Sequence, residues 1–405
     1  MKIILYENNS VDKLYPITLT RPSFDIFCGG ATLYQVVETI FAGSPVDYNV
    51  RDYLSATVEK KYPRQNNNDK ETLILNGSLI PSFEAAERLA EIIKNQQEVK
   101  IKNGERVIGA FVINQKIETR EQKIEEYLSG LDIETVEIDW PNFEYAWETV
   151  TYNQEILQDN LEYLKTDYQE IKPDVYVGKN VILPKETVID SSHGIVIIGE
   201  GTIVLPFCHL AGPLYIGRNC LIREFTVLKY SCCLGPVSKV AGEIEAAVFQ
   251  GFGNKNHYGF LGYSYLGEWV NLSAGTTTSN LKNTYGSIKV SGIDTGEQFL
   301  GAIIGDYART AINTAIYTGK VIGVGSHLYS TVTKDIPSFT AYAAALGCVA
   351  EFELAEAVKI QKIVMARRGL EQAEIDRRLL EDIFQITKGE REKNHIKPGK
   401  LEFKN

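Results

Sequence analysis

The sequence predicts three consecutive parts: an α/β domain over residues 1–170, a parallel β-helix over residues 173–336 and a helical tail over residues 337–405. Three observations predict this division. The front alternates short apolar runs with helical spacing, the middle repeats aliphatic residues every six positions, and the end is charged with apolar residues at helical spacing. With 405 residues, the chain also exceeds the roughly 250–300 residues at which one hydrophobic core stops growing.

The front domain is predicted from its apolar runs. Residues 82–95 have helical apolar spacing behind Ser82, a candidate N-cap, and residues 149–168 predict a helix that leads out of the domain. Strands are expected over residues 1–7, over residues 71–81, where the run ends in an Asn-Gly turn, and over residues 106–113.

The middle part has an internal repeat. A step of six residues fits neither an α-helix nor an alternating strand, but it is typical of a parallel β-helix built from hexapeptide turns. Each flat face takes one hexapeptide, so a triangular coil takes three, and the aliphatic position of each hexapeptide fills the shaft. This position holds Ile198, Val204, Leu210, Ile216, Ile222, Leu228, Leu234 and Val240.

Three of the six cysteines occupy a small position of this repeat. Cys208, Cys220 and Cys232 are twelve residues apart. A metal or redox cluster would explain the spacing, but tight packing of a small buried side chain is the favoured interpretation. Because the chain also has no CxxC motif, a reducing cytoplasm is expected.

Two stretches interrupt the sixfold repeat, and the tail that follows the repeat has helical spacing of its apolar residues instead. Residues 241–259 and 279–303 are expected to be loops that leave the shaft, where binding groups are usually found. His257 lies at the end of the first. Within the tail, residues 351–390 predict one or two amphipathic helices that pack on the shaft or on a neighbouring chain.

Composition narrows the choice of partners. Apolar residues make up 44% and charged residues 23%, as in an ordinary soluble globular protein. The net charge of −10 argues against nucleic acid or an anionic membrane as the main partner, because both attract basic surfaces. The apolar run at the N-terminus is too short for a signal peptide, and no stretch approaches a membrane span.

The repeat region resembles the acetyltransferase half of the bifunctional N-acetylglucosamine-1-phosphate uridyltransferase/glucosamine-1-phosphate acetyltransferase family. That family has a His-x-x-Tyr-x-Gly run, then Val-Asn-Ile-Gly-Ala-Gly-Thr, then an asparagine. Here His257, Phe260 and Gly262 open the match, residues 270–276 continue it, and Asn280 ends it without a gap. The family's lysine matches Lys229.

The resemblance implies a left-handed β-helix, a homotrimer with active sites between shafts, and acyl transfer from acetyl-CoA to a sugar amine. His257 would then be the general base, and Lys229 would contact a phosphate. Asn271 and Asn280 would contact the sugar or the acyl group, and backbone near Ala274 would steady the thioester oxygen.

Several positions depart from the family pattern. The family's arginine falls on Ala211, so its phosphate contact is lost unless Arg223 replaces it. The family's tyrosine becomes Phe260, and the acidic residue before the lysine becomes Val227. A longer loop is expected before His257. The pocket is therefore expected to keep its outline and to take a different acceptor, or to bind without turnover.

The front domain resembles sugar-1-phosphate nucleotidyltransferases through residues 14–22, LYPITLTRP. The family's glycine-rich loop is replaced by ENNSVDK, and Ser78 stands where an aspartate would hold Mg²⁺. Mg²⁺ is thus implied by the family, but the usual carboxylate is missing. Arg21 and Asp25 are the candidate nucleotide-binding residues, with Glu7 as a further acid near the expected site.

Three functions remain open on these residues. The first is an acyl-CoA-dependent N-acyltransferase acting on an amino-sugar phosphate or a nucleotide sugar, which Lys229, His257, Asn271 and Asn280 favour. The second is a sugar-1-phosphate nucleotidyltransferase, which the loss of the glycine loop disfavours. The third is a non-catalytic protein that binds a sugar nucleotide or takes part in an assembly.

Overall fold

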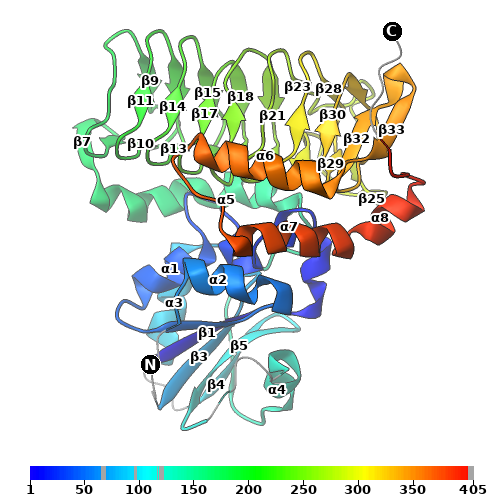
Figure 1. Ribbon diagram of the computed structural model, residues 1–405. Coiled ribbons are helices and arrows are strands. Elements are labelled where there is room, and N and C mark those ends of the chain that lie inside the picture. Colours follow the sequence, from blue (N-terminus) through cyan, green and yellow to red (C-terminus); the bar gives the residue numbers. More distant parts are fainter. Residues whose placement is uncertain (65–69, 95–97, 116, 118–122, 400–405) are drawn as a thin grey trace.

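The computed structural model describes residues 1–64, 70–94, 98–115, 117 and 123–399 (Figure 1). It contains an N-terminal α/β domain, a parallel β-solenoid packed against it, and helices near the C-terminus that run along both. The predicted order of α/β domain, β-helix and helical tail is confirmed. None of the described helices has the length and hydropathy needed to cross a lipid bilayer.

The N-terminal domain is built on one mixed sheet with the strand order β2-β1-β3-β5-β4-β6. β1 is parallel to β2 and β3, whereas β5 runs antiparallel to β3. The strands are β1 (Lys2–Tyr6), β2 (Val46–Asn49), β3 (Glu71–Asn76), β4 (Val99–Asn103), β5 (Arg106–Ile113) and β6 (Thr135–Glu137). The helices are α1 (Leu33–Ile40), α2 (Ser55–Lys61), α3 (Phe83–Ile93), α4 (Ile124–Gly130) and α5 (Glu148–Leu164).

The expected elements of this domain are confirmed. β1, β3 and β5 are the predicted strands, and α3 and α5 are the predicted helices. Ser82 caps α3 by accepting a hydrogen bond from the backbone N–H of Ala85 at 3.2 Å. Position 95, the predicted end of α3, lies outside the described residues.

The solenoid has three faces, each formed by strands stacked in parallel. The first face contains β8 (Val175–Val177), β10 (Val196–Ile198), β13 (Leu214–Ile216), β16 (Cys232–Leu234), β19 (Val248–Phe249), β22 (Tyr265–Leu266), β26 (Ile303–Ile304) and β29 (Val321–Ile322). At its N-terminal edge, β7 (Gln169–Lys172) pairs antiparallel with β8.

The second face contains β11 (Ile203–Val204), β14 (Leu221–Ile222), β17 (Lys239–Val240), β20 (Asn254–Lys255), β27 (Arg309–Thr310), β30 (His327–Leu328) and β32 (Thr340–Ala343), with β33 (Cys348–Glu351) antiparallel at its end. Bridges through Asn271 connect β20 with β27.

The third face contains β9 (Val188–Asp190), β12 (His209–Ala211), β15 (Val227–Lys229), β18 (Glu243–Glu245) and β21 (Phe260–Gly262), followed by β23 (Thr277–Thr278), β28 (Ala315–Ile316) and β31 (Thr331–Val332).

The first predicted loop is wrong. Residues 241–259 form a complete coil, because β18, β19 and β20 each pair with the strand one coil earlier. The step breaks because this coil is shorter. Ile216 pairs with Leu234, eighteen positions on, whereas Leu234 pairs with Phe249, only fifteen positions on. A shortened coil and an inserted loop both interrupt a sixfold repeat, so the sequence alone does not distinguish them.

The second predicted loop is confirmed. The loop expected over residues 279–303 leaves the shaft after β23 and contains an antiparallel hairpin of β24 (Lys289–Val290) and β25 (Ile293–Asp294). The shaft then resumes at β26, which pairs with β22.

The cysteines of the repeat are free thiols buried in the shaft. The Cys220 thiol donates to the carbonyl of Gly235 and the Cys232 thiol to that of Lys229. Burial raises the pKa of Cys220 to about 12 and that of Cys232 to about 11. These thiols stay protonated and act as small core side chains.

The C-terminal part begins as strand and ends as helix. β32 and β33 extend the second face, although residues 337–405 were predicted to be helical. The amphipathic helices expected to pack on the shaft then follow as α6 (Leu354–Ala366), α7 (Glu374–Ile386) and the short α8 (Lys388–Lys393). α6 runs along the solenoid and α7 lies between it and α2 (Figure 1).

A buried ion pair joins the N-terminal domain to the solenoid. The Arg21 guanidinium lies 2.7 Å from the Asp306 carboxylate, and these side chains are 4% and 2% exposed. Glu268 is 3.4 Å from the same guanidinium. Burial alone would lower the pKa of Arg21, but the carboxylates of Asp306 and Glu268 raise it well above its usual value.

We expect Arg21→Met to lower the free energy of unfolding by about 3–5 kcal/mol, because it leaves the buried Asp306 carboxylate and the half-buried Glu268 carboxylate without their cation. Urea unfolding followed by fluorescence measures this. Arg106 provides the matched control, since its ion pair with Glu144 has side chains 46% and 44% exposed. Arg106→Met should cost no more than about 1 kcal/mol. Equal losses for both variants would contradict a buried bridge at Arg21.

Candidate functional site

A cavity of about 330 Å³ lies between the second face of the solenoid and the end of α6. We call it the cationic cavity, after its four Lys and Arg side chains. Its walls include His257 and Asn271, two of the residues singled out from the sequence. It is lined by Lys239, Phe252, Asn254, Asn256, His257, Trp269, Val270, Asn271, Arg309, Val364, Arg367 and Arg368.

The solenoid register explains why distant residues meet here. Lys239 pairs with Asn254, Asn254 bridges to Asn271, and Asn271 bridges to Arg309. These four residues therefore occupy the same position in successive coils. The side-chain amide of Asn254 donates to Oδ1 of Asn271 at 2.6 Å, which leaves Nδ2 of Asn271 to donate elsewhere.

His257 lies at the corner where the chain turns from the second face to the third. It is exposed, and the carbonyl of the next residue, Tyr258, accepts a hydrogen bond from Gly275 in the following coil. Gly259 completes the corner with a φ of +126°, and a Cβ there would lie 2.2 Å from the Thr276 carbonyl oxygen. The corner therefore requires glycine and holds its own shape.

A buried lysine supports the same corner from inside the shaft. Lys255 is 1% exposed, and its ammonium donates to the carbonyls of Ala241 at 3.1 Å and His257 at 3.0 Å. Burial lowers the pKa of Lys255 from its usual 10.5 to about 8. The sequence pattern did not reveal this residue, because it occupies a column that is aliphatic in the preceding coils, at Val204, Ile222 and Val240.

We expect Lys255→Met to change the pH dependence of stability. Between pH 8 and 10.5 the unfolded state binds more protons at Lys255 than the folded state, so this lysine makes the wild type more stable as the pH rises. The free energy of unfolding of Lys255→Met minus that of the wild type should therefore fall by about 3 kcal/mol from pH 7 to above pH 10. Urea unfolding at each pH measures it. A difference that does not vary with pH would contradict the lowered pKa.

The cationic cavity contains an excess of positive charge. Lys239, Arg309, Arg367 and Arg368 line it, and its lining includes no Asp or Glu. Desolvation, followed by repulsion from Arg368 and Arg367, lowers the pKa of Lys239. Desolvation and Arg367 also lower the pKa of Arg309 and of Arg368. Two buried wall atoms, Nε of Arg309 and Oδ1 of Asn256, have no hydrogen-bond partner among the described residues.

Lys229 lies on the third face, away from the lining of this cavity. Its ammonium is 2.8 Å from Glu245 and 3.1 Å from Glu243. The hydrogen bond to Glu245 is the main cause of a raised Lys229 pKa. The longer loop expected before His257 is in fact the coil of β18–β20, so Glu245 stands between Lys229 and Gly262 in the register of the third face.

The remaining predicted acyltransferase residues fall into two groups. Phe260 and Asn280 both lie against Gly262 on the third face, where an added Cβ would meet their side chains at 2.6 and 2.9 Å. Ala274 is one coil after His257 in the same corner, and its carbonyl accepts from Asn313 at 2.8 Å. Arg223 pairs with its neighbour Glu224 at 2.9 Å and does not line the cavity.

The structure places Arg21 and Asp25 inside the interface between the domains. Asp25 is 3% exposed and pairs with Lys61 at 2.7 Å, and it accepts from the Tyr62 hydroxyl at 2.6 Å. Glu7 pairs with Arg51 at 3.0 Å. Within the described part of the chain, no three His, Cys, Asp or Glu side chains are close enough to hold a metal ion. The residues at the expected site do not fit the Mg²⁺ that the resemblance implies, because Asp25 and Glu7 are paired with Lys61 and Arg51, and Ser78 stands where the family has an aspartate.

The segment that replaces the family's glycine-rich loop, together with the motif that follows it, folds as three short 3₁₀ helices, η1 (Asn9–Leu14), η2 (Ile17–Leu19) and η3 (Ser23–Asp25). The Thr20 hydroxyl donates to Asp306 at 2.8 Å, and the Gln250 amide donates to the Asp25 carbonyl at 2.7 Å. This segment thus packs onto the first face of the solenoid.

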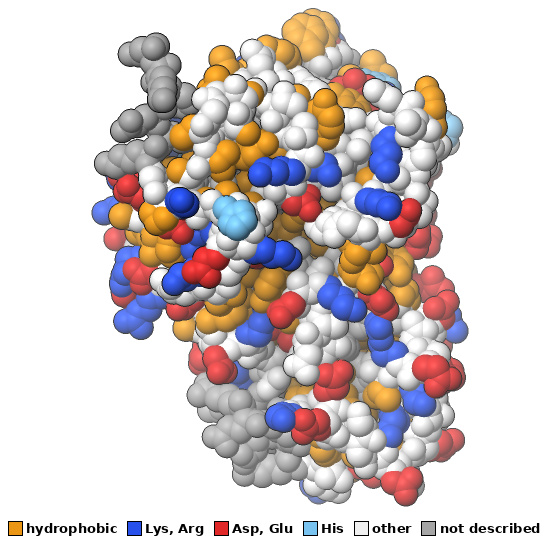
Figure 2. Space-filling model, turned by 90° about the vertical axis from the view of Figure 1, so that its right-hand side faces the viewer, with side chains coloured by type: hydrophobic (Ala, Val, Ile, Leu, Met, Phe, Trp, Pro, Cys, Tyr) orange, Lys and Arg blue, Asp and Glu red, His pale blue; other side chains and the backbone are white. Residues whose placement is uncertain are grey.

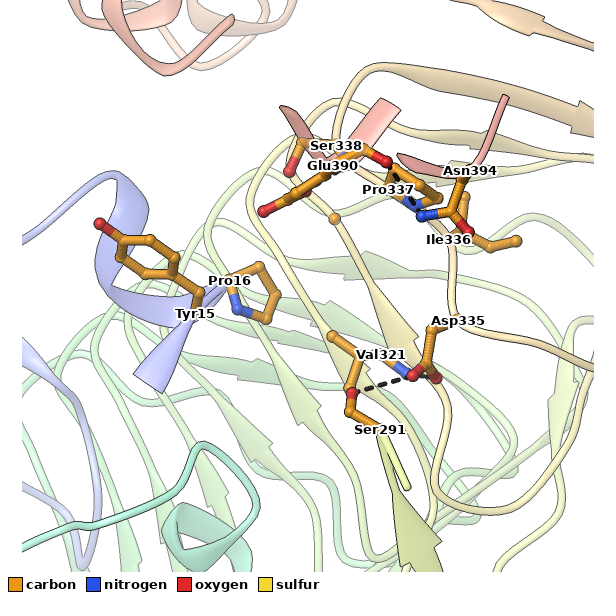
Figure 3. A pocket seen from close by; sticks show the side chains of 11 residues that line it. Tyr15, Pro16, Ser291, Val321, Asp335, Ile336, Pro337, Ser338, Glu390 and Asn394 are labelled. Carbon is orange, nitrogen blue, oxygen red and sulfur yellow. Dashed lines mark hydrogen bonds between the residues drawn. The ribbon is translucent and has the colours of Figure 1, made fainter. Parts of the chain in front are cut away.

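Two other cavities have acidic linings. One, of about 230 Å³, lies where Tyr15 and Pro16 approach the last coils and α8; its charged side chains are Asp335 and Glu390 (Figure 3). The other, of about 590 Å³, is in the N-terminal domain and has one arginine among three glutamates, Glu105, Glu144 and Glu148. Of these three cavities, the cationic one is the best suited to a phosphate ligand.

The surface seen in Figure 2 has mixed charge. Lys and Arg side chains alternate with Asp and Glu over both the solenoid and the N-terminal domain. The side chains drawn in colour on this face therefore form no continuous basic band of the kind that binds a nucleic-acid backbone.

Sequence reasoning missed most of the cationic cavity. Arg367 and Arg368 lie in the tail, which was expected to pack on the shaft, but nothing in the sequence indicates which coil they approach. Lys239, Asn254 and Arg309 share a column, which becomes visible only when the lengths of the intervening coils are known.

Two family models match the chain. Residues 3–169 match the sugar nucleotidyl transferase family, and residues 195–229 match the bacterial transferase hexapeptide (six repeats) family. The protein resembles bifunctional GlmU-type transferases. The nucleotidyl transferase match precedes the hexapeptide match along the chain.

Curated relatives agree with this resemblance. A bifunctional sugar-1-phosphate nucleotidylyltransferase/acetyltransferase of Sulfurisphaera tokodaii is 31% identical over 145 residues, which is 34% of this chain and 35% of that protein. The bifunctional protein GlmU of Synechococcus sp. strain CC9902 is 30% identical over 143 residues, 35% of this chain and 25% of that protein. The match thus spans about a third or less of these relatives.

Among solved structures, the UDP-N-acetylglucosamine acyltransferase of Francisella novicida matches at 15% identity, over 53% of this chain and 78% of that chain, with a TM-score of 0.29. A score this low carries no argument about function.

Proposed function

We propose that this GlmU-like protein is an acyl-CoA-dependent N-acyltransferase acting on an amino-sugar phosphate or a nucleotide sugar, with its active site at the cationic cavity. The observation that carries the proposal is that His257 and Asn271 line one cavity together with four cations and no carboxylate. Acyl transfer to the amine of a phosphorylated sugar requires a base for the amine proton, a hydrogen-bond donor and positive charge near the phosphate.

In the proposed reaction, His257 accepts a proton from the acceptor amine as its nitrogen attacks the thioester carbonyl. A new amide C–N bond forms and the C–S bond breaks, and the imidazolium then protonates the departing thiolate. Asn271, oriented by its hydrogen bond with Asn254, has an amide nitrogen that can donate to the acceptor or the acyl oxygen. The exposed position of His257 supports direct access of the amine.

We expect His257→Ala to lower acyl-transfer turnover by roughly 10²–10⁴, the usual effect of losing a general base, and to leave the fold intact. Steady-state release of free CoA measures turnover, and circular dichroism checks the fold. His209 on β12 is the matched control, because it does not line the cavity. If His257→Ala keeps wild-type acyl transfer, the assignment of the base is wrong.

The homotrimer that the resemblance implies would bring three further residues to the site: Lys229, Phe260 and Asn280. In a trimer, the third face of one chain can approach the cavity of its neighbour and supply acceptor contacts. Lys229→Ala should then raise the KM for a phosphorylated acceptor by about 10-fold or more, as for a lost hydrogen bond to a charged group, with little effect on acetyl-CoA.

Light scattering at micromolar concentration tests the trimer independently of activity. If the protein is monomeric and Lys229→Ala keeps the wild-type KM for the acceptor, Lys229 is not part of the site.

Sugar-1-phosphate nucleotidyl transfer is the second candidate, supported by the family match over residues 3–169. The buried, paired states of Arg21 and Asp25 count against it. A thermal-shift panel of acetyl-CoA, UTP, dTTP and UDP-sugars separates the candidates, since a ligand that binds only the native state raises the melting temperature. Stabilisation by UTP or dTTP, with release of pyrophosphate, would favour nucleotidyl transfer. Stabilisation by a UDP-sugar without any turnover would favour a binding protein.

A further inference from the structure

The cationic cavity holds more positive charge than the candidate acyl-transfer chemistry alone requires. Lys239 and Arg309 come from the second face, and Arg367 and Arg368 follow α6 on the opposite wall. No ion pair within the described chain involves any of the four. Clustered cations without counter-charges destabilise the site until an anion enters it, and the lowered pKa values of Lys239, Arg309 and Arg368 have this physical origin in part.

The arginines of the outer wall are held in place by the chain itself. The Gln361 amide, 1% exposed, donates to the hydroxyl of Tyr307 on the solenoid at 3.2 Å and to the carbonyl of Asp376 at 3.1 Å. At the other end of the segment, Phe352 stacks on His327 of β30 with ring centroids 3.9 Å apart. α6 is thus held along the second face through its middle and through the residue pair that precedes it, so Arg367 and Arg368 need no neighbouring chain to reach the cavity.

We propose that the cationic cavity binds the diphosphate group of a nucleotide, and that Arg367 and Arg368 close this site within a single chain. The choice of a nucleotide rests on the proposed function, in which both the acyl donor and a nucleotide-sugar acceptor carry a diphosphate. A diphosphate spreads its oxygens over two phosphorus atoms, so cations from both walls of the cavity can each reach one. Two arginines side by side also offer the planar donor groups that pair well with phosphate oxygens.

The size and the apolar part of the wall agree with this ligand. A volume of about 330 Å³ is ample for a diphosphate and lies within the roughly 300–1,000 Å³ range of small-molecule sites. Phe252 and Trp269, stacked with centroids 4.3 Å apart, form the aromatic part of the lining and would contact the organic portion next to the phosphates.

The test is calorimetric binding to the full-length protein, without turnover. The probes are CoA, UDP, UMP and inorganic pyrophosphate. We expect Arg367→Gln/Arg368→Gln to weaken CoA or UDP binding roughly 10- to 100-fold, as for lost hydrogen bonds to a charged group. Lys362→Gln is the matched control, because it removes one positive charge from the exposed side of α6 and does not line the cavity. It should leave affinity within about twofold, as expected for a solvent-exposed, screened charge.

Lys239→Gln serves as a second variant from the opposite wall, in case the double substitution shifts α6. Pyrophosphate should compete with the bound nucleotide, and UMP should bind at least about 10-fold more weakly than UDP, since it lacks a second charged group. Equal affinity for UMP and UDP, failure of pyrophosphate to compete, or unchanged binding in both arginine and lysine variants would overturn the proposal.

The CoA and UDP arms identify the source of the diphosphate. If CoA binds and competes with pyrophosphate, the site holds the acyl donor; if UDP does so, it holds the sugar nucleotide. Loss of binding in Arg367→Gln/Arg368→Gln supports the diphosphate site, whatever the effect of His257→Ala on acyl transfer. The binding test and the turnover test can therefore contradict one proposal without contradicting the other. Binding of neither CoA nor UDP would overturn this one.

Discussion

In-register stacking of coils is the constraint on which the rest of the structure depends. Each strand of the solenoid hydrogen-bonds to the strand one coil earlier, so a side chain is placed by its position within a coil and hardly at all by its distance along the chain. Lys239 and Arg309 are 70 positions apart in sequence, yet they belong to one column of the second face. The same stacking directs the corner of His257 toward that column, because the corner hydrogen-bonds to the next coil through Tyr258.

The N-terminal domain is attached to this rigid stack by charge as well as by apolar contact. The Arg21 guanidinium forms ion pairs with the carboxylates of Asp306 and Glu268. The Gln250 side chain of the solenoid accepts a hydrogen bond from the N–H of Phe27 and donates one to the carbonyl of Asp25, on either side of Ile26. The motif that resembles the nucleotidyltransferase signature is therefore part of a domain interface.

The sequence allowed the order of the domains, the coiled middle and the helices of the tail to be predicted, because hydrophobic periodicity reports directly on which side chains face a core. It also indicated His257 and Asn271, which share the cavity. It misassigned residues 241–259, because a shortened coil keeps its inward positions while losing the sixfold count. Lys255 illustrates the difficulty: a lysine stands in the shaft, satisfied by two carbonyls, where the pattern leads one to expect an aliphatic residue. The basic wall opposite depends on how the tail folds back, which no local pattern encodes.

The reversed strands at the ends of the solenoid have a consequence for how the protein behaves in a crowded solution. A stack of parallel strands has open edges that could accept another chain and grow into a fibre. Here β7 runs against β8 at one end of the first face, and β33 runs against β32 at the end of the second. β7 is exposed along its whole length, and apart from Ile171 its side chains are charged or polar. Such terminal strands prevent further stacking, because they offer an added parallel coil neither the matching strand direction nor an apolar column to pack against.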